Sequence, residues 1–285
     1  MRHGWTLALG ILAGLSGCAP EQPFAVNWMQ QLGLQTPSGP DVVQIEMVLL
    51  ERPLNDRYIN EDLWRQADEQ VVPLENKAVL EENGFRVGQL GGLTPGGLQT
   101  LLTSRQDGAD PRLLFLRAGK TQSLPLGPPR ALCRFQIEQH GWPEEVRLAD
   151  AQAALELVPS ITGDGRLRLR FVPQIEYGQS RLQMNPAEDN SGLLLQQQKP
   201  RQAYPALAWE VVLAPNQYLI AGTRMDRPES LGYQCFFRPD ENRPVQRLLV
   251  LRASRMADPD VCLASAGAGL PDQSALALQA ARMPR

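Results

Sequence analysis

The strongest structural signal in this chain is the stretch Leu155-Glu-Leu-Val-Pro-Ser-Ile-Thr-Gly-Asp-Gly-Arg-Leu-Arg-Leu-Arg-Phe-Val172. Its second half alternates arginine with apolar residues, which is the period of a β-strand covered on one face and open on the other. Between the halves, Thr162-Gly-Asp-Gly165 favours a tight turn. The stretch therefore predicts a β-hairpin with Leu167, Leu169 and Phe171 on the covered face and Arg166, Arg168 and Arg170 on the open face.

The open face of this predicted hairpin has two interpretations. A row of guanidinium groups could bind a partner protein, so Arg166, Arg168 and Arg170 are candidate partner-binding residues. Solvated or ion-paired arginines with no further role are also common on exposed strand faces. The sequence leaves both interpretations open.

Further strands and turns are expected on both sides of the hairpin, because short apolar runs alternate with glycine and proline. A polar segment at 178–205, interrupted by Leu193-Leu-Leu195, predicts an excursion with one extra hairpin. Residues 207–213 and 218–224 are expected to pair as another hairpin. The remaining expected strands are 122–126, 131–138, 145–148, 151–159, 232–237 and 245–253, although alanines leave a helix open for part of 151–159.

Helices are expected mainly before residue 118. Asn60 is a good N-cap followed by acidic residues, which predicts a helix over 60–70. A second helix at 74–82 should end at Asn83-Gly84, and a third is expected at 95–103 after Pro95. With strands at 41–50, 85–90 and 113–117, residues 41–118 predict a small α/β unit.

The composition excludes several classes of protein. The 285 residues carry a net charge of −3, and no block of lysine or arginine gives the footprint of a nucleic-acid-binding protein. A hydrophobic content of 43% excludes wholesale disorder, while 24 Gly and 24 Pro indicate many turns and short strands. Beyond the first residues, no apolar run approaches the length needed to cross a membrane.

The N-terminus has the layout of an export signal. Arg2 and His3 precede an apolar run at 5–15 that is too short to span a bilayer. Leu15-Ser16-Gly17-Cys18 then resembles the lipobox of bacterial lipoproteins. The resemblance implies a signal peptide at 1–17, cleavage between Gly17 and Cys18, and acylation of the Cys18 thiol. The alternative is a buried N-terminal helix with an incidental cysteine.

Two segments flank the expected folded body. Residues 18–40 are rich in Pro, Gln and Gly and predict a flexible tether, while 257–285 predict a tail that is mostly disordered. Ala19 after the cysteine resembles the sorting signal of outer-membrane lipoproteins in some Gram-negative bacteria. We therefore expect a chain anchored in the cell envelope through Cys18, in the outer membrane and facing the periplasm.

The other cysteines are Cys133, Cys235 and Cys262, an odd number, so at least one thiol should stay unpaired within the chain. Cys133 and Cys235 lie in apolar strand-like settings that favour small buried hydrophobes. A bridge between two of the three stays open. Without a Cys-x-x-Cys spacing, the sequence does not indicate a zinc site or a redox pair.

No catalytic or cofactor motif stands out, so we expect neither a metal nor a cofactor. His140 is the only histidine after the signal, and His140-Gly141-Trp142-Pro143 reads as a turn rather than a catalytic base. Carboxylates such as Glu81-Glu82 and Asp258 with Asp260 leave an envelope hydrolase acting on a cell-wall polymer as the alternative function. A small-ligand carrier would require a closed apolar cavity.

Several stretches resemble the β-domain of bacterial secretins. The residues 157–173 are similar to a secretin strand that turns through Asp-Gly into a second strand, and Val211-Val-Leu-Ala-Pro-Asn-Gln-Tyr-Leu-Ile-Ala-Gly222 is similar to a secretin turn followed by a strand ending in Gly. Residues 246–255 resemble the closing strand of the module, and 41–50 its opening strand. The pore-lining and membrane-spanning hairpins are missing, and Ser230-Leu-Gly-Tyr233 is at most a remnant of the secretin lip motif.

The sequence as a whole predicts an α+β protein, with an α/β unit at 41–118 and a β-rich module at 119–256. The resemblance implies a secretin-like module without a pore. We therefore expect a lipid-anchored envelope protein with a structural or protein-binding role in a secretion or pilus-type assembly. Its expected partners are the membrane, through Cys18, and envelope or secretion-system proteins.

Overall fold

The computed structural model describes residues 41–91, 93–104, 111–139, 141–186, 192–239 and 244–254. The chain divides into two compact units, residues 1–36 and 37–285, and every described residue belongs to the second. Among the described residues, no helix is long and apolar enough to cross a membrane. Cys18, the tether, His140, Cys262 and the tail lie outside the described residues.

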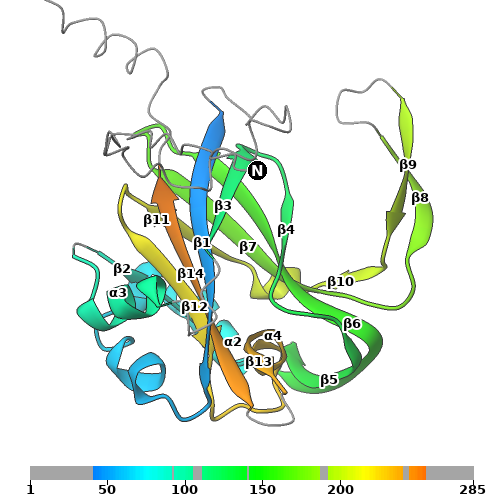
Figure 1. Cartoon of the computed structure of the whole chain (residues 1–285). Helices are drawn as coiled ribbons and strands as arrows, with labels where there is room; N and C mark the ends of the chain where they lie inside the picture. Colours follow the sequence, from blue (N-terminus) through cyan, green and yellow to red (C-terminus); the bar gives the residue numbers. More distant parts are fainter. Residues whose placement is uncertain are drawn as a thin grey trace, which may run out of the picture. The chain divides into compact units, whose positions relative to one another are not determined.

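The first sheet is antiparallel and has the order β2-β12-β14-β1-β3 (Figure 1). The register places Leu49 of β1 opposite Leu249 of β14, and β13 adds a short extra pairing to β14. The bounds are Val42–Pro53 (β1), Phe85–Leu90 (β2), Arg112–Arg117 (β3), Tyr218–Thr223 (β12), Phe237–Arg238 (β13) and Val245–Ser254 (β14).

The second sheet has the order β10-β7-β6-β4, with β11 also paired to β7 and β5 to the first half of β6. The predicted hairpin forms: β6 and β7 pair, with Val158 opposite Arg170, and Gly165 in the turn has a φ of 79°. The bounds are Gln122–Pro125 (β4), Arg130–Gln139 (β5), Trp142–Ile161 (β6), Leu167–Glu176 (β7), Arg201–Ala203 (β10) and Trp209–Leu213 (β11).

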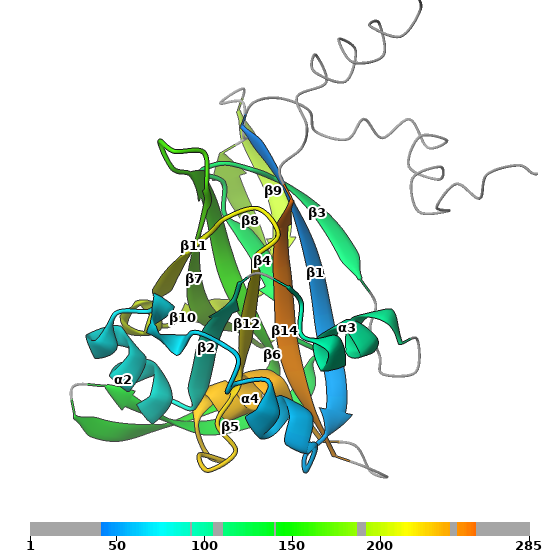
Figure 2. The ribbon, with the colours of Figure 1, turned by 90° about the vertical axis from the view of Figure 1, so that its left-hand side faces the viewer.

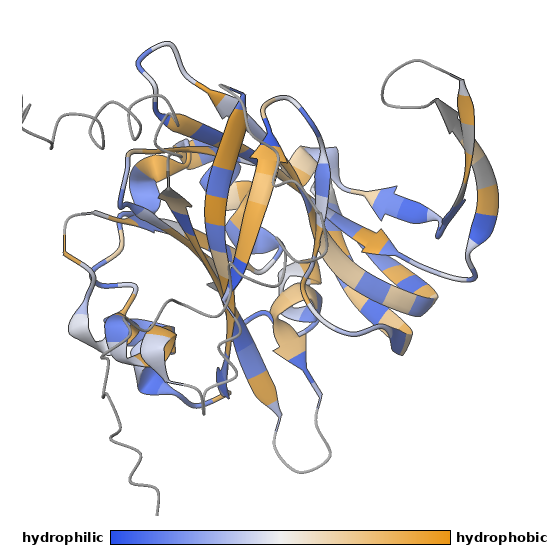
Figure 3. Cartoon of the chain, turned by 45° about the horizontal axis from the view of Figure 1, so that its top comes forward, coloured by the Kyte–Doolittle hydropathy of each residue, from blue (hydrophilic) through white to orange (hydrophobic). Residues whose placement is uncertain are grey.

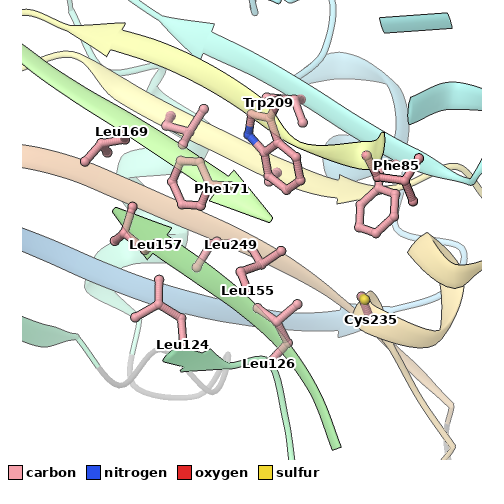
Figure 4. Packing of buried hydrophobic residues seen from close by; sticks show 14 of the residues in the cluster. Phe85, Leu124, Leu126, Leu155, Leu157, Leu169, Phe171, Trp209, Cys235 and Leu249 are labelled. Atoms are coloured by element: carbon pink, nitrogen blue, oxygen red, sulfur yellow. The ribbon is translucent and has the colours of Figure 1, made fainter. Parts of the chain in front are cut away.

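The main core lies between the two sheets, as Figure 4 shows. The rings of Phe171 and Trp209 stack with their centroids 5.2 Å apart, and Phe85 packs on Trp209 from the first sheet at 5.9 Å. Apolar residues at alternate positions of β6, β7 and β14 fill the space around them, so strand periodicity dictates this layer. The further members include Leu124, Leu155, Leu157, Leu169 and Leu249.

The π-helix region and α3 cover the opposite face of the first sheet (Figure 2). Leu248 and Val250 of β14 point to this side and pack with Trp64 and Leu98, so β14 is apolar on both faces because both are covered. The helical elements of the chain are a π-helix at Tyr58–Asp62, 3₁₀ turns at Glu69–Val71 and Pro205–Leu207, α2 (Leu74–Glu82), α3 (Gly96–Thr103) and α4 (Leu231–Phe236).

The α+β prediction is confirmed, but several local predictions are wrong. Residues 232–237 form mainly helix α4 instead of a strand, because the Ser230 hydroxyl accepts the Tyr233 N–H as a helix cap. The predicted strands 145–148 and 151–159 are one continuous strand, β6. Residues 207–213 and 218–224 do not pair as a hairpin, since β11 joins β7 and β12 joins β14 and β2 in the other sheet.

Two further differences concern the N-terminal half. The helix predicted over 60–70 starts earlier and is a π-turn, because Asp56 rather than Asn60 accepts the first N–H groups, those of Tyr58 and Ile59. The strands within residues 41–118 share a sheet with β12 and β14. The segment that was expected to be a separate α/β unit therefore has no sheet of its own.

Candidate functional site

The arginine face, defined as Arg166, Arg168 and Arg170 of the β6–β7 hairpin, lies on the exposed side of the second sheet. Arg166 pairs with Asp164 (Nε to Oδ2, 2.7 Å) and Arg168 pairs with Glu210 of β11 (Nε to Oε1, 3.3 Å). Hydrogen bonds from the Thr162 hydroxyl and Arg166 lower the pKa of Asp164. The sheet thus places the three arginines in one row.

The ion pairs on this face are exposed on both sides. The side chains of Arg168 and Glu210 are 48% and 47% exposed, so water screens their attraction and the pair contributes little to folding stability. Pairs of this kind exchange partners at low cost. The ion pairs of the arginine face are therefore not what holds the fold together.

A second feature is the side of the protein where both sheets end. Among the described residues, β3 pairs only with β1 and β4 only with β6, so each has one edge without a neighbouring strand. A short turn at 118–121 joins the two strands, and there the Gly119 N–H donates to the Pro159 carbonyl at 2.7 Å. Leu113 of β3 is exposed beside this edge. Open edges of this kind accept an extended segment of a partner protein.

The third feature is the hairpin arm, formed by β8 (Arg181–Pro186) and β9 (Leu193–Gln198). It confirms the extra hairpin expected within 178–205. Within the described residues, its strands pair only with each other, and the arm extends away from the two sheets in Figure 1. Its exposed large apolar side chains are Leu182, Met184, Leu193 and Leu195.

A partly buried polar cluster joins β5 to α4. The Arg130 guanidinium donates to the Gln234 side-chain oxygen at 2.8 Å and to the Phe237 carbonyl. Burial lowers the pKa of Arg130 and raises the pKa of both Cys133 and Cys235. Both thiols are free and buried, as expected for small hydrophobes, and their protonated state makes them poor nucleophiles and metal ligands.

Of the carboxylates singled out as catalytic alternatives, the structure describes Glu81 and Glu82, and their surroundings differ. Glu81 is ion-paired with Lys77 (3.7 Å) and Arg224 (3.4 Å), while Glu82 is exposed to solvent. Asp258 and Asp260 lie outside the described residues. In the part of the chain that the structure describes, no three His, Cys, Asp or Glu side chains gather as a metal site.

A small hollow lies beside α2. Its volume is about 200 Å³, including space open to solvent, and charged side chains line part of it: Glu69, Lys77, Glu81 and Arg86. Ligand pockets usually hold about 300–1,000 Å³ and are mostly apolar. This hollow is therefore not the closed apolar cavity that a small-ligand carrier requires.

Sequence reasoning found some of these features and missed others. The structure brings Arg166, Arg168 and Arg170 together, whereas Gly17 and Cys18 lie outside the described residues. The apolar face of the hairpin arm and the open edges of β3 and β4 were missed. The run Leu193-Leu-Leu195 was the sequence signal for the apolar face of the arm, because an apolar run within a polar segment is unusual. The open edges of β3 and β4 could not be predicted, because the strand order is not known from the sequence.

No protein-family model matches this chain, and no curated protein matches it in sequence. Among solved structures, it is weakly similar to the InvG secretin domain of the Salmonella SPI-1 injectisome, with a TM-score of 0.23 and 12% identity over 91% of this chain and 79% of that chain. A near-atomic structure of the same Salmonella secretin gives a TM-score of 0.19 and 12% identity over 81% and 70%.

The Salmonella basal-body assembly of InvG, PrgH and PrgK gives a TM-score of 0.19 and 12% identity over 81% of this chain and 50% of that chain. All three likenesses are weak in both sequence and superposition. They do not assign a function to this chain.

Proposed function

We propose that this protein is a lipid-anchored component of the cell envelope, attached through Cys18, with a structural or protein-binding role in a secretion or pilus-type assembly. It faces the periplasm from the outer membrane and acts by contact with other proteins rather than by catalysis. The observation that carries the proposal is the adjacent pair of open strands, β3 and β4, at which both sheets end.

Two properties of the described surface support protein binding. An edge strand offers backbone N–H and C=O groups to an extended segment, which is a common mode of peptide recognition. The arginine face adds cations whose present ion pairs are exposed and weak. Together they suit a partner that contributes a strand and carries acidic side chains.

The anchor is tested by replacing Cys18 with Ser in the producing cell. We expect the variant to leave the membrane fraction or to accumulate as an uncut precursor, whereas the parent chain fractionates with outer membranes. Mass spectrometry of the mature N-terminus should show an acylated Cys18. Unchanged fractionation together with an unmodified N-terminus would contradict the lipoprotein assignment.

The protein-binding role is tested by affinity purification from detergent-solubilised envelopes. We expect secretion or pilus components to copurify with the parent chain. Leu113→Lys should reduce their recovery, because a charge on an open edge opposes strand addition. Leu132→Lys is the matched control, since Leu132 is exposed on β5, away from this edge.

The arginine face is tested in the same way with the triple variant Arg166→Gln, Arg168→Gln, Arg170→Gln. A control with Arg57→Gln, Arg65→Gln and Arg147→Gln removes three other exposed arginines. Loss of partners in the first variant alone supports the proposal. Hydrolysis of wall material by the purified parent chain, with no copurifying protein, would instead favour the envelope hydrolase.

A further inference from the structure

The apolar residues of the hairpin arm lie on one face of its two strands. The register places Met184 opposite Leu195, and side chains directly opposite each other share a face, to which Leu193 also belongs by its two-residue spacing from Leu195. Leu182, two positions before Met184, lies on the same face. Four large apolar side chains between 60% and 70% exposed thus form a single patch: Leu182, Met184, Leu193 and Leu195. Figure 3 shows the hydrophobic bands along the arm.

A two-stranded hairpin without other partners is only marginally stable in water. In the described part of the chain, the arm has no third strand, and its apolar patch faces solvent. Contiguous exposed apolar patches on a folded protein are often functional contact surfaces. We infer that the apolar face of the hairpin arm lies on an anionic phospholipid surface, giving the protein a second, non-covalent contact with the membrane.

The size of the patch disfavours a second copy of the chain as the occupant. The four side chains expose on the order of 200–400 Å² of apolar surface. A stable interface between two proteins buries about 800 Å² on each side. A bilayer has no such minimum, because each apolar side chain that enters the interfacial region contributes independently.

Charge at the base of the arm fits the headgroups of anionic lipids. Lys199 follows β9 directly, at an even spacing from Leu195 that places it on the side of the apolar face, whereas Arg181, one position before Leu182, lies on the opposite face of β8. Basic residues beside an apolar patch are attracted by phosphatidylglycerol and similar lipids.

The length of chain between the anchor and the body allows this contact, a step that rests on the proposed lipidation of Cys18. About 24 residues separate Cys18 from the start of β1, and a stretch of this length spans at most about 80–85 Å even when fully extended. A lipid on Cys18 would therefore keep the body close to the bilayer. Binding of the arm becomes an intramolecular step with a high effective concentration.

The test measures binding of the mature chain from residue 18, carrying Cys18→Ser, to vesicles by flotation. Without an acyl chain, the result does not depend on whether the natural protein is lipidated. We expect binding to vesicles of phosphatidylethanolamine with phosphatidylglycerol, weaker binding to phosphatidylcholine vesicles, and a decrease at high salt. Met184→Gln with Leu195→Gln should weaken binding by about tenfold or more.

The matched control is Leu93→Gln with Leu132→Gln, which removes two other exposed apolar side chains away from the arm. It should bind as the parent does, and circular dichroism should show the same fold for both variants. Equal binding of the two variants, or no binding by the parent, would overturn the inference. A parent that is oligomeric by light scattering, and monomeric only after Met184→Gln with Leu195→Gln, would assign the patch to a second copy instead.

Discussion

Arg247 and Glu51 form an ion pair across β14 and β1 in which the arginine side chain is only 4% exposed (Nε to Oε1, 2.9 Å). The same guanidinium donates to the Leu126 carbonyl at 2.7 Å, just after β4 of the second sheet. Glu51 also accepts Arg238 at 3.0 Å. One buried cation therefore connects the two sheets near the open edge of β4.

Replacing Arg247 with Met should lower the free energy of unfolding by about 2–4 kcal/mol, because the Leu126 carbonyl and Glu51 lose a buried donor. Urea denaturation measures the change. Arg252→Met is the control, since the Arg252–Glu46 pair is more exposed and longer, at 3.5 Å, and should cost less than about 1 kcal/mol. Equal losses for both variants would show that Arg247 does not hold the sheets together.

Gly232→Ala should be strongly destabilising. A Cβ at Gly232 would lie 2.4 Å from the carbonyl carbon and oxygen of Gly84, where helix α4 contacts the backbone before β2. Because the obstacle is backbone, we expect a loss of about 2–3 kcal/mol in thermal or urea unfolding. Gly96→Ala provides the contrast: nothing lies within 4 Å of its Cβ, so stability should be unchanged or rise by up to about 1 kcal/mol.

Asn83→Ala should remove the hydrogen bonds that connect the end of α2 to β5. The Asn83 amide is almost fully buried, donates to the Val79 and Glu138 carbonyls, and accepts the Glu138 N–H at 2.8 Å. Its removal leaves backbone groups unpaired in the interior, so we expect a loss of about 2–3 kcal/mol in chemical denaturation. Gln66→Ala removes an exposed amide hydrogen bond and should change stability by less than about 0.5 kcal/mol.

The buried thiols predict a stability that falls at alkaline pH. Burial raises the pKa of Cys133 and Cys235 above their value in the unfolded chain, so the folded state holds these protons more tightly. Their contribution is fully present below the unfolded thiol pKa of about 8.5 and is lost as the pH rises beyond it. The urea midpoint should therefore fall between about pH 8 and pH 10.

The variant Cys133→Ala with Cys235→Ala tests the source of this pH dependence. The urea midpoint of this variant should fall less with rising pH than that of the parent chain. Part of the fall should persist, because burial also raises the pKa of Tyr204. In the parent chain, both thiols should react with a disulfide reagent only after unfolding. Rapid reaction of Cys133 or Cys235 in the folded protein would contradict the buried, protonated state.

Sequence reasoning succeeded where local chemistry and burial agree. The β6–β7 hairpin, α2 and β2 have the predicted positions because alternation, an Asn-Gly stop and a tight turn are local signals. It failed at 232–237, where a short apolar run suits either a strand or a buried helix. There, the Ser230 cap and the close approach of Gly232 to Gly84 decide for the helix.

The pairing of strands that are far apart in the chain could not be predicted from the sequence. Residues 41–118 look like a unit of their own, yet β1 and β2 are completed by β14 and β12 from the other end of the chain. The same limit applies to the predicted 207–224 hairpin, whose strands belong to different sheets. Strand order depends on which apolar faces pack together, and contacts between segments far apart in the chain produce no repeating pattern in the sequence.

By itself, the sequence determined the α+β class and the arginines on the open face of the β6–β7 hairpin, and it supplied the lipobox-like stretch Leu15-Ser16-Gly17-Cys18 from which the anchor is proposed, because each depends on neighbouring residues. Only the tertiary structure decided that both sheets end at β3 and β4, that Arg247 is buried, and that the apolar face of the hairpin arm is exposed. These features depend on which surfaces the rest of the chain covers, and burial is a property of the whole fold.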